Sequence, residues 1–145
     1  MTTLGKGLLA GLAGTAAMTV SSTVEEKLRG RPPSSAPADA AAKVLGMKEF
    51  ASDAARARFA TAVHWSYGTS WGVVRAVLGS RLPPPAATAA HLAAVWGSEQ
   101  VMLPALGVAP PITQWGKEDI AIDGFHHVVY ATAAGLTYGL LDRRR

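Results

Sequence analysis

The sequence predicts an all-α fold, a bundle of four transmembrane helices with a long polar connection between the first and second. Residues 7–24, 59–74 and 124–141 carry no formally charged side chain, and residues 82–116 carry only Glu99. Each stretch is bounded by charged residues and approaches the roughly 20 apolar residues that cross a bilayer. Charged residues make up only 17% of the chain, and 15 of its 145 residues are glycine, a residue frequent in membrane helices.

A soluble helical bundle rich in alanine is the alternative fold. Mean hydropathy is only +0.18, because alanine and glycine fill the apolar stretches in place of leucine. The length favours a single membrane domain over residues 1–145. The chain has no cysteine, which excludes a disulfide framework and thiolate chemistry.

The first predicted span covers about residues 4–24. Gly7 and Gly11 are four residues apart, and this small-xxx-small spacing lets the backbone of another helix approach closely. A cleaved signal peptide is the alternative, but Lys6 alone is a weak positive region and three more apolar segments follow. Residues 25–58 then form an interfacial connection, with a short helix predicted over residues 38–45.

The second predicted span covers about residues 59–79. His64, Gly68, Gly72 and Arg75 recur at helical spacing, so we expect them to share one face directed into the bundle. Arg75 lies near the helix end, where snorkelling to lipid headgroups is favoured over an internal ion pair. Tyr67 lies close to this face.

The third predicted span, about residues 86–106, contains Glu99. An ionised carboxylate costs several kcal/mol at the centre of a span, so we expect Glu99 to face the bundle interior or to have a partner. The alternative is that Glu99 has no functional role and makes a structural hydrogen bond between helices. Residues 107–116 contain a Pro-Pro pair and are predicted to form an interfacial or re-entrant loop.

The fourth predicted span covers about residues 119–141. Asp123, His127 and Tyr130 are spaced to share one face, while His126 points elsewhere and is expected at the surface or at an interface. A carboxylate one turn from an imidazole can orient it or join it in holding a metal. In this span two further glycines are expected to pack against a neighbouring helix, Gly135 and Gly139.

From residue 64 to residue 145 the order of features resembles that of the YagU-like family of small multi-span bacterial inner-membrane proteins. The string PALGVAPP at residues 104–111 is the most specific part. The resemblance implies residence in the inner membrane and a role in acid tolerance. Glu99 is a departure, because the family pattern has histidine there. The residues that carry the resemblance are His64, Gly68, Gly72, Pro104, Gly107, Pro110, Pro111, Asp119, Asp123 and His127.

Three functions remain open from these residues. The first is a membrane bundle whose buried polar cluster moves or senses protons or another ion. The second is a haem- or metal-binding membrane protein, with His64 and His127 as ligands and Glu99 or Asp123 as third partner. The third is an accessory subunit of a homo-oligomer or a larger membrane complex. The expected cluster comprises His64, Glu99, Asp123 and His127, with Tyr67 and Tyr130 nearby.

The remaining features favour a protein that is not an enzyme. The chain contains no G-x-S-x-G nucleophile motif and no G-x-x-x-x-G-K phosphate loop. Its net charge of +4 and pI of about 9.8 are explained by anionic lipid at the helix ends and do not require nucleic acid. Because Arg143, Arg144 and Arg145 directly follow the last span, both termini are predicted to be cytoplasmic.

Overall fold

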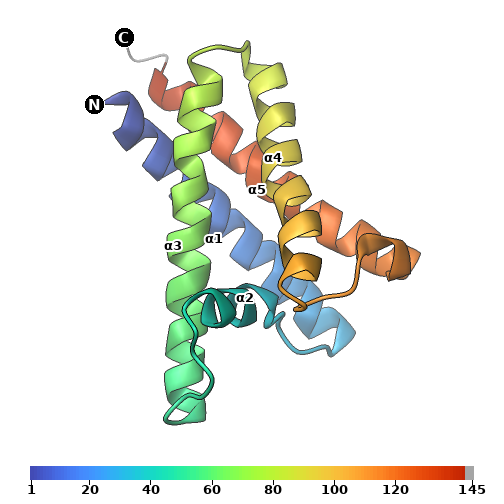
Figure 1. The fold of residues 1–145 in the computed structure, drawn as a ribbon. Helices are drawn as coiled ribbons and strands as arrows, with labels where there is room; N and C mark the ends of the chain where they lie inside the picture. The colour runs from blue at the N-terminus through green and yellow to red at the C-terminus, as the bar shows by residue number, and fades with distance from the viewer. Residues whose placement is uncertain (143–145) are drawn as a thin grey trace.

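The computed structural model describes residues 1–142 and shows an all-α molecule (Figure 1). No β-strand occurs in that range. The predicted helical fold class is confirmed, and each of the four predicted long segments corresponds to one helix. In chain order the elements are α1 (Thr3–Arg29), α2 (Ala36–Val44), α3 (Asp53–Gly79), α4 (Pro84–Ala105), the 3-10 turn η1 (Ile112–Gln114) and α5 (Lys117–Asp142).

Two of the long helices extend well beyond the predicted limits, because a charged residue ends an apolar stretch without ending a helix. α1 continues through charged residues to Arg29 and ends at Gly30, whose φ of 65° terminates it in the left-handed conformation. α3 begins at Asp53, where the Ser52 hydroxyl accepts a hydrogen bond of 3.1 Å from the Ala55 amide.

By length and composition, α1 is the one helix within residues 1–142 that is long and apolar enough to cross a membrane. α3 and α5 begin with charged turns, and α4 contains proline, histidine, Glu99 and Gln100 among its alanines. Alanine, glycine and serine also contribute less apolar character than leucine. The four-span bundle is therefore not confirmed by this criterion.

α1 and α3 meet through their backbones. A Cβ on Gly7 would lie against the Gly72 carbonyl, and one on Gly11 would lie against the Thr69 carbonyl. Lower along the same face, Gly68 lies against the side chain of Thr15. The small residues predicted to share one face of α3 thus receive α1, as the crossing of the two helices in Figure 1 shows.

α5 packs against both α1 and α4. Gly14 of α1 accommodates the ring of Tyr130, and Gly135 accommodates the Thr88 side chain of α4. Gly139 does not match its predicted packing role, since no described atom lies within 4 Å of the place where its Cβ would be. It lies on the outer side of α5, beside the exposed Leu140.

The PALGVAPP string forms the end of α4 and the loop after it. Gly107 adopts a φ of 62°, which favours glycine, and its amide donates to the Pro104 carbonyl at 2.9 Å. The Val108 amide donates to the Leu103 carbonyl at 2.9 Å. The string that is the most specific part of the YagU-like resemblance thus ends α4. The loop predicted at residues 107–116 follows it, with η1 as its regular element.

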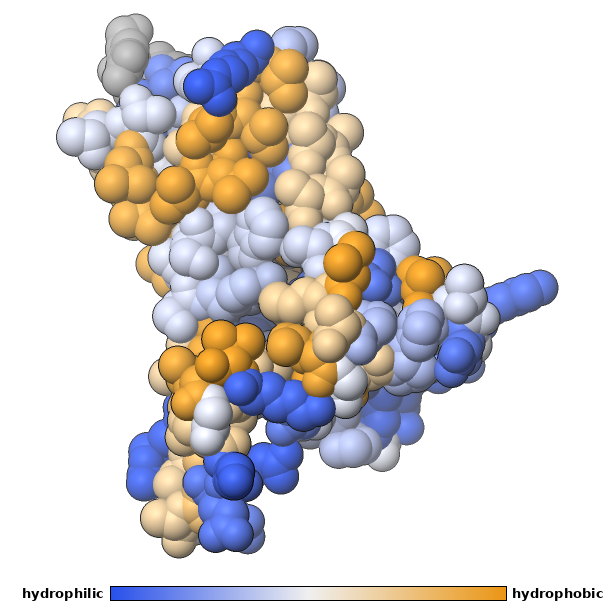
Figure 2. All heavy atoms as spheres, viewed as in Figure 1, coloured by the Kyte–Doolittle hydropathy of each residue, from blue (hydrophilic) through white to orange (hydrophobic). Residues whose placement is uncertain are grey.

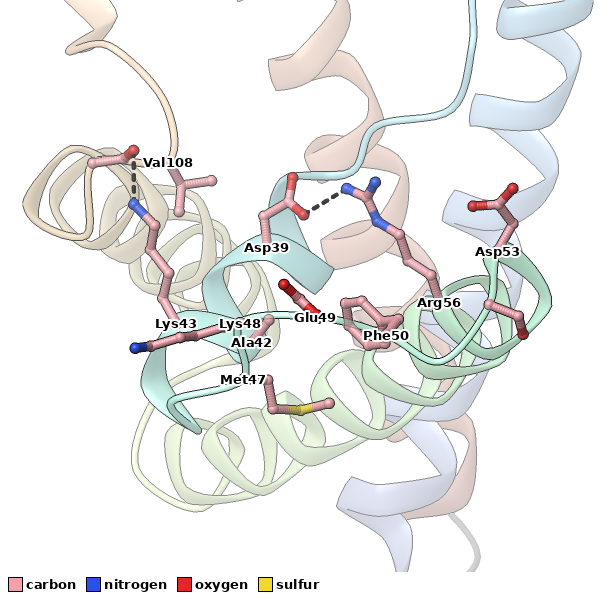
Figure 3. Close-up of a pocket in the computed structure, with 12 residues that line it drawn as sticks. Asp39, Ala42, Lys43, Met47, Lys48, Glu49, Phe50, Asp53, Arg56 and Val108 are labelled. Carbon is pink, nitrogen blue, oxygen red and sulfur yellow. Dashed lines mark hydrogen bonds and ion pairs between the residues drawn. The ribbon is translucent and has the colours of Figure 1, made fainter.

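α2 is tied to two other elements at one end of the bundle. The Lys43 ammonium donates to the carbonyls of Leu106 and Gly107 at 2.7 and 3.1 Å, and Arg56 pairs with Asp39 at 2.9 Å (Figure 3). An open cleft of about 670 Å³ lies among these residues. The polar contacts beside this cleft join α2 to the loop after α4, through Lys43, and to α3, through Asp39. These contacts hold α2 in place.

Apolar and charged residues are distributed in an unusual way. Large apolar side chains are exposed along the outer faces of all four long helices, whereas Lys6 and Arg75 are only 2% and 1% exposed. In Figure 2 apolar residues cover much of the upper part of the bundle, and charged residues gather at the end that carries α2 and the first turns of α3. A few polar and charged groups therefore lie inside a mainly apolar core, while many large apolar side chains face outward.

Candidate functional site

A polar cluster lies where α4 meets α5. His127 Nε2 is 3.0 Å from Glu99 Oε2, and the two side chains are 5% and 16% exposed. The His127 Nδ1–H donates to the backbone carbonyl of Asp123 at 2.8 Å, one turn earlier in α5. A carbonyl oxygen can only accept, so in a neutral ring the hydrogen is on Nδ1 and Nε2 carries a lone pair.

That assignment places two acceptors face to face. The Nε2 lone pair and the Glu99 carboxylate repel each other at 3.0 Å unless a positive charge lies between them or on the ring. Glu99 thus faces the interior and has a partner, as the sequence predicts.

Asp123 is the third member of the cluster and the one most exposed to solvent. Its Oδ2 accepts a hydrogen bond of 2.6 Å from Trp96 Nε1, and its Oδ1 lies 3.7 Å from His127 Nδ1. The Asp123 side chain is 32% exposed. One donor atom from each of Glu99, Asp123 and His127 lies within 4.8 Å of the others, the one such group of three within residues 1–142.

Trp96 covers the cluster. Its ring stacks on that of His127 with 6.5 Å between centroids and an interplanar angle of 28°. The indole also lies over Gly124, where an added Cβ would be only 3.3 Å from it. Trp96 is not among the residues predicted to form the site. Its signal in the sequence is its position three residues before Glu99, which puts the two on one face of the same helix.

His64 does not join this cluster, so its predicted role as a shared ligand requires correction. Its Nε2 lies 2.8 Å from the hydroxyl of Thr19 on α1. Because that hydroxyl already donates to the Thr15 carbonyl at 2.7 Å, Nε2–H of His64 is the donor to Thr19. The spacing put His64 on the correct face, but that face receives α1, and Glu99 and Asp123 lie on other helices.

The two tyrosines also lie apart from the cluster. The Tyr130 hydroxyl donates to the Gly68 carbonyl of α3 at 2.6 Å, and its ring packs near His91 with 5.6 Å between centroids. Tyr67 makes an edge contact with Trp71 on its own helix. His91 is completely buried, and its Nε2–H donates to the Trp71 carbonyl at 3.1 Å.

His126 is buried against α1, which excludes the surface position that was one of its two expected locations. It is 5% exposed, and its Nδ1–H donates to the Ser21 hydroxyl at 2.9 Å, since that hydroxyl donates to the Met18 carbonyl. Its Nε2 lies 3.7 Å from Glu25. α5 is buried on two sides, by α1 and α4, so adjacent histidines can both face inward. The expectation allowed for one buried face only.

Two buried cations mark the end of the bundle that carries both termini (Figure 1). Lys6 pairs with Asp142 at 2.8 Å, which joins the two ends of the chain. Arg75 is buried and does not snorkel; its guanidinium lies 4.8 Å above the Tyr138 ring, and its Nε has no hydrogen-bond partner within residues 1–142. Its place in the last turns of α3 lets the negative helix end stabilise it.

An ion pair joins α1 and α5 at the opposite end. Arg29 donates to Glu118 at 2.7 Å, and the guanidinium holds the pKa of that carboxyl below its usual range. Both side chains are well exposed, so solvent screens the interaction.

Comparison of the chain with known protein families, with curated proteins and with solved structures gives no match. The function is therefore argued from the geometry of the cluster and from the surface of the bundle.

Proposed function

We propose that the chain is a multi-span membrane protein that holds a cation between α4 and α5 and serves an ion-linked role. The observation that carries the proposal is the meeting of two acceptors, His127 Nε2 and Glu99 Oε2, at 3.0 Å inside the bundle. Their close approach is favourable only when a proton or another cation lies between them.

The surface of the bundle supports membrane residence. Fourteen of the exposed large apolar residues lie on the four long helices, while Lys6, Arg75 and three of the four histidines are buried. A bilayer is the solvent in which this arrangement is favourable. The exposed residues are Leu4, Leu8, Leu9, Leu12, Val20, Val24, Leu28, Val73, Val77, Val101, Phe125, Val128, Leu136 and Leu140.

Both termini lie at one end of the bundle, which is consistent with an even number of spans (Figure 1). In this proposal the membrane is the bacterial inner membrane, and the basic residues at that end place both termini in the cytoplasm. We expect the chain to remain with membranes after alkaline carbonate washing. A stable, detergent-free monomer in the soluble fraction would contradict membrane residence.

A double-mutant cycle tests the cation between the two acceptors. Glu99→Gln and His127→Gln each keep the size of the side chain and remove one side of the interaction. We expect the two substitutions to be strongly non-additive in melting temperature, with a coupling energy of about 0.5–3 kcal/mol. The matched control is Glu99→Gln with His64→Gln, because His64 bonds to Thr19 on another helix face.

Additive effects in the first cycle, equal to those in the control, would show that Glu99 and His127 do not share a cation. That result would remove the ion-linked role and leave a structural one.

The geometry favours the carboxylate–imidazole cluster over haem ligation. A haem held between two histidines requires two imidazoles directed at a common space. Here His64 bonds to α1 and His127 contacts α4, each with a different partner.

An accessory-subunit role is the second candidate function, favoured by the outer face of α4. Ala89, Ala93 and Gly97 are exposed and four residues apart, and no described atom lies within 4 Å of a Cβ at Gly97. Such a face allows close approach of another helix, from a second copy or a larger membrane complex. Co-purification in mild detergent tests this role.

The acid-tolerance role implied by the YagU-like resemblance is tested by survival at low pH of cells with and without the protein.

A further inference from the structure

We infer that the cation held by this cluster is a first-row divalent transition metal of the Zn²⁺ or Co²⁺ type, bound by Glu99, Asp123 and His127. This inference rests on the proposed cation-binding function and names the class of ion. It differs from the ligand set expected from the sequence, because His64 is excluded and both Glu99 and Asp123 are ligands, where the sequence left one or the other as third partner.

The donor set selects the class of metal. Two carboxylates alone suit Mg²⁺ or Ca²⁺, which prefer oxygen ligands, whereas an imidazole nitrogen favours zinc and its neighbours in the first transition row. His127 supplies that nitrogen from a position only 5% exposed. Three protein ligands leave a fourth position for water or a bound molecule, as in open zinc sites.

The distances agree with a shared ion. Zinc lies about 2.0–2.2 Å from nitrogen and oxygen ligands, so two ligands of one ion are at most about 4.4 Å apart. The three donor atoms already lie within 4.8 Å of one another. This span is slightly wider than the limit, so metal binding requires the donor atoms of Glu99 and Asp123 to move closer to His127.

The ligands are oriented by groups outside the donor set. The Asp123 carbonyl accepts the Nδ1–H of His127 and thereby directs the lone pair of Nε2 toward Glu99. Trp96 Nε1 donates to Oδ2 of Asp123, which leaves Oδ1 available as a ligand. Partners of this kind fix the tautomer and the direction of metal ligands.

Charge balance favours a divalent ion over a monovalent one. Two ionised carboxylates and a neutral imidazole carry a charge of −2, and a divalent ion brings the cluster to zero. A monovalent ion leaves one negative charge between helices, where an uncompensated charge is costly. Asp123, the most exposed of the three side chains, marks the side from which an ion can reach the site.

The test uses the full chain in detergent, stripped with a chelator and titrated with Zn²⁺, Co²⁺ or Mg²⁺ in a calorimeter. We expect one Zn²⁺ per chain and no Mg²⁺ binding at the same concentrations. Co²⁺ gives visible absorption bands that report nitrogen and oxygen ligation. His127→Gln should abolish these bands, while His126→Gln, which removes the neighbouring imidazole bonded to Ser21, should leave them unchanged.

Trp96→Phe gives a second, milder variant that does not depend on losing a ligand. It keeps an aromatic ring over His127 but removes the hydrogen bond to Asp123, and we expect metal affinity to fall by about 10- to 100-fold. Circular dichroism confirms that each variant retains its helices.

Two results overturn the inference: no binding of Zn²⁺ or Co²⁺ to the wild-type chain, or unchanged Co²⁺ bands in His127→Gln. If a proton or Mg²⁺ occupies the site instead, binding of Zn²⁺ and Co²⁺ is absent while the Glu99–His127 coupling persists, and the inference fails but the proposed function stands. If the coupling is also absent, both fail.

Discussion

The α1–α3 interface and the α4–α5 interface are built from opposite kinds of residue. At the first, Gly7 and Gly11 place their backbone against that of Gly72, and the side chains beside them are as small as that of Ala76. At the second, Trp96 and Glu99 reach from α4 to polar groups of α5. One interface brings backbones into contact, and the other separates them by polar side chains.

This difference suggests different roles for the two interfaces: packing for α1–α3 and binding for α4–α5. Contact between backbones leaves no room for an ion or a ligand, so the α1–α3 face serves packing. Polar side chains at α4–α5 are costly to bury and are favourable only when they satisfy one another or hold an ion. Substitutions at the first interface should therefore change stability, and those at the second should change binding.

The largest effect is expected at the first interface. Gly72→Leu inserts a side chain where the carbonyl of Gly7 lies, so the helices must separate. Overpacking of this kind costs about 1–3 kcal/mol or more, and we expect a lower melting temperature in detergent or aggregation. Gly97→Leu is the control on the open face of α4 and should leave the melting profile nearly unchanged. Equal effects of the two substitutions would mean that α1 and α3 do not meet through Gly72.

The pattern of small residues predicted the first interface better than the second. Regular spacing of His64, Gly68 and Gly72 fixed one face of α3, and the structure places all three against α1. Spacing along a helix specifies which residues share a face, but it does not specify which helix covers that face. His64 was therefore predicted to face Glu99, although its partner is Thr19.

The α4–α5 cluster was predicted in part, for a physical reason. The cost of burying Glu99 required a partner, and His127 with Asp123 one turn before it was the available pair. The indole of Trp96 was not predicted, because its role depends on how α4 is rotated against Gly124. The burial of His126 likewise depends on α5 having two neighbours, which no periodicity within α5 indicates.

A moderate effect is expected where α5 meets α3. Tyr130→Phe removes the hydroxyl that donates to the Gly68 carbonyl at 2.6 Å, and it keeps the ring that packs on Gly14. The loss of one buried hydrogen bond costs about 1 kcal/mol, measurable as a lower melting temperature. Tyr67→Phe is the control, since its ring contacts Trp71. If Tyr130→Phe is no more destabilising than this control, the hydrogen bond between α5 and α3 does not contribute to stability.

The smallest effect is expected at the exposed ion pair between α1 and α5, and it depends on pH. The Arg29 guanidinium lowers the pKa of Glu118 in the folded chain, so the pair stabilises the fold above the ordinary pKa of a glutamate. This contribution is lost as the pH falls through the lowered folded value. The melting temperature of wild type should exceed that of Glu118→Gln slightly at pH 7, and the difference should disappear once the pH is below the lowered folded pKa of Glu118. High salt should also reduce the difference, because both side chains are exposed.

Glu49→Gln, at the α2 cleft, is the control for removing a carboxylate without removing this pair. A difference between wild type and Glu118→Gln that stays constant as the pH falls from 7 through the lowered folded pKa would show that the ion pair does not join α1 to α5 in solution.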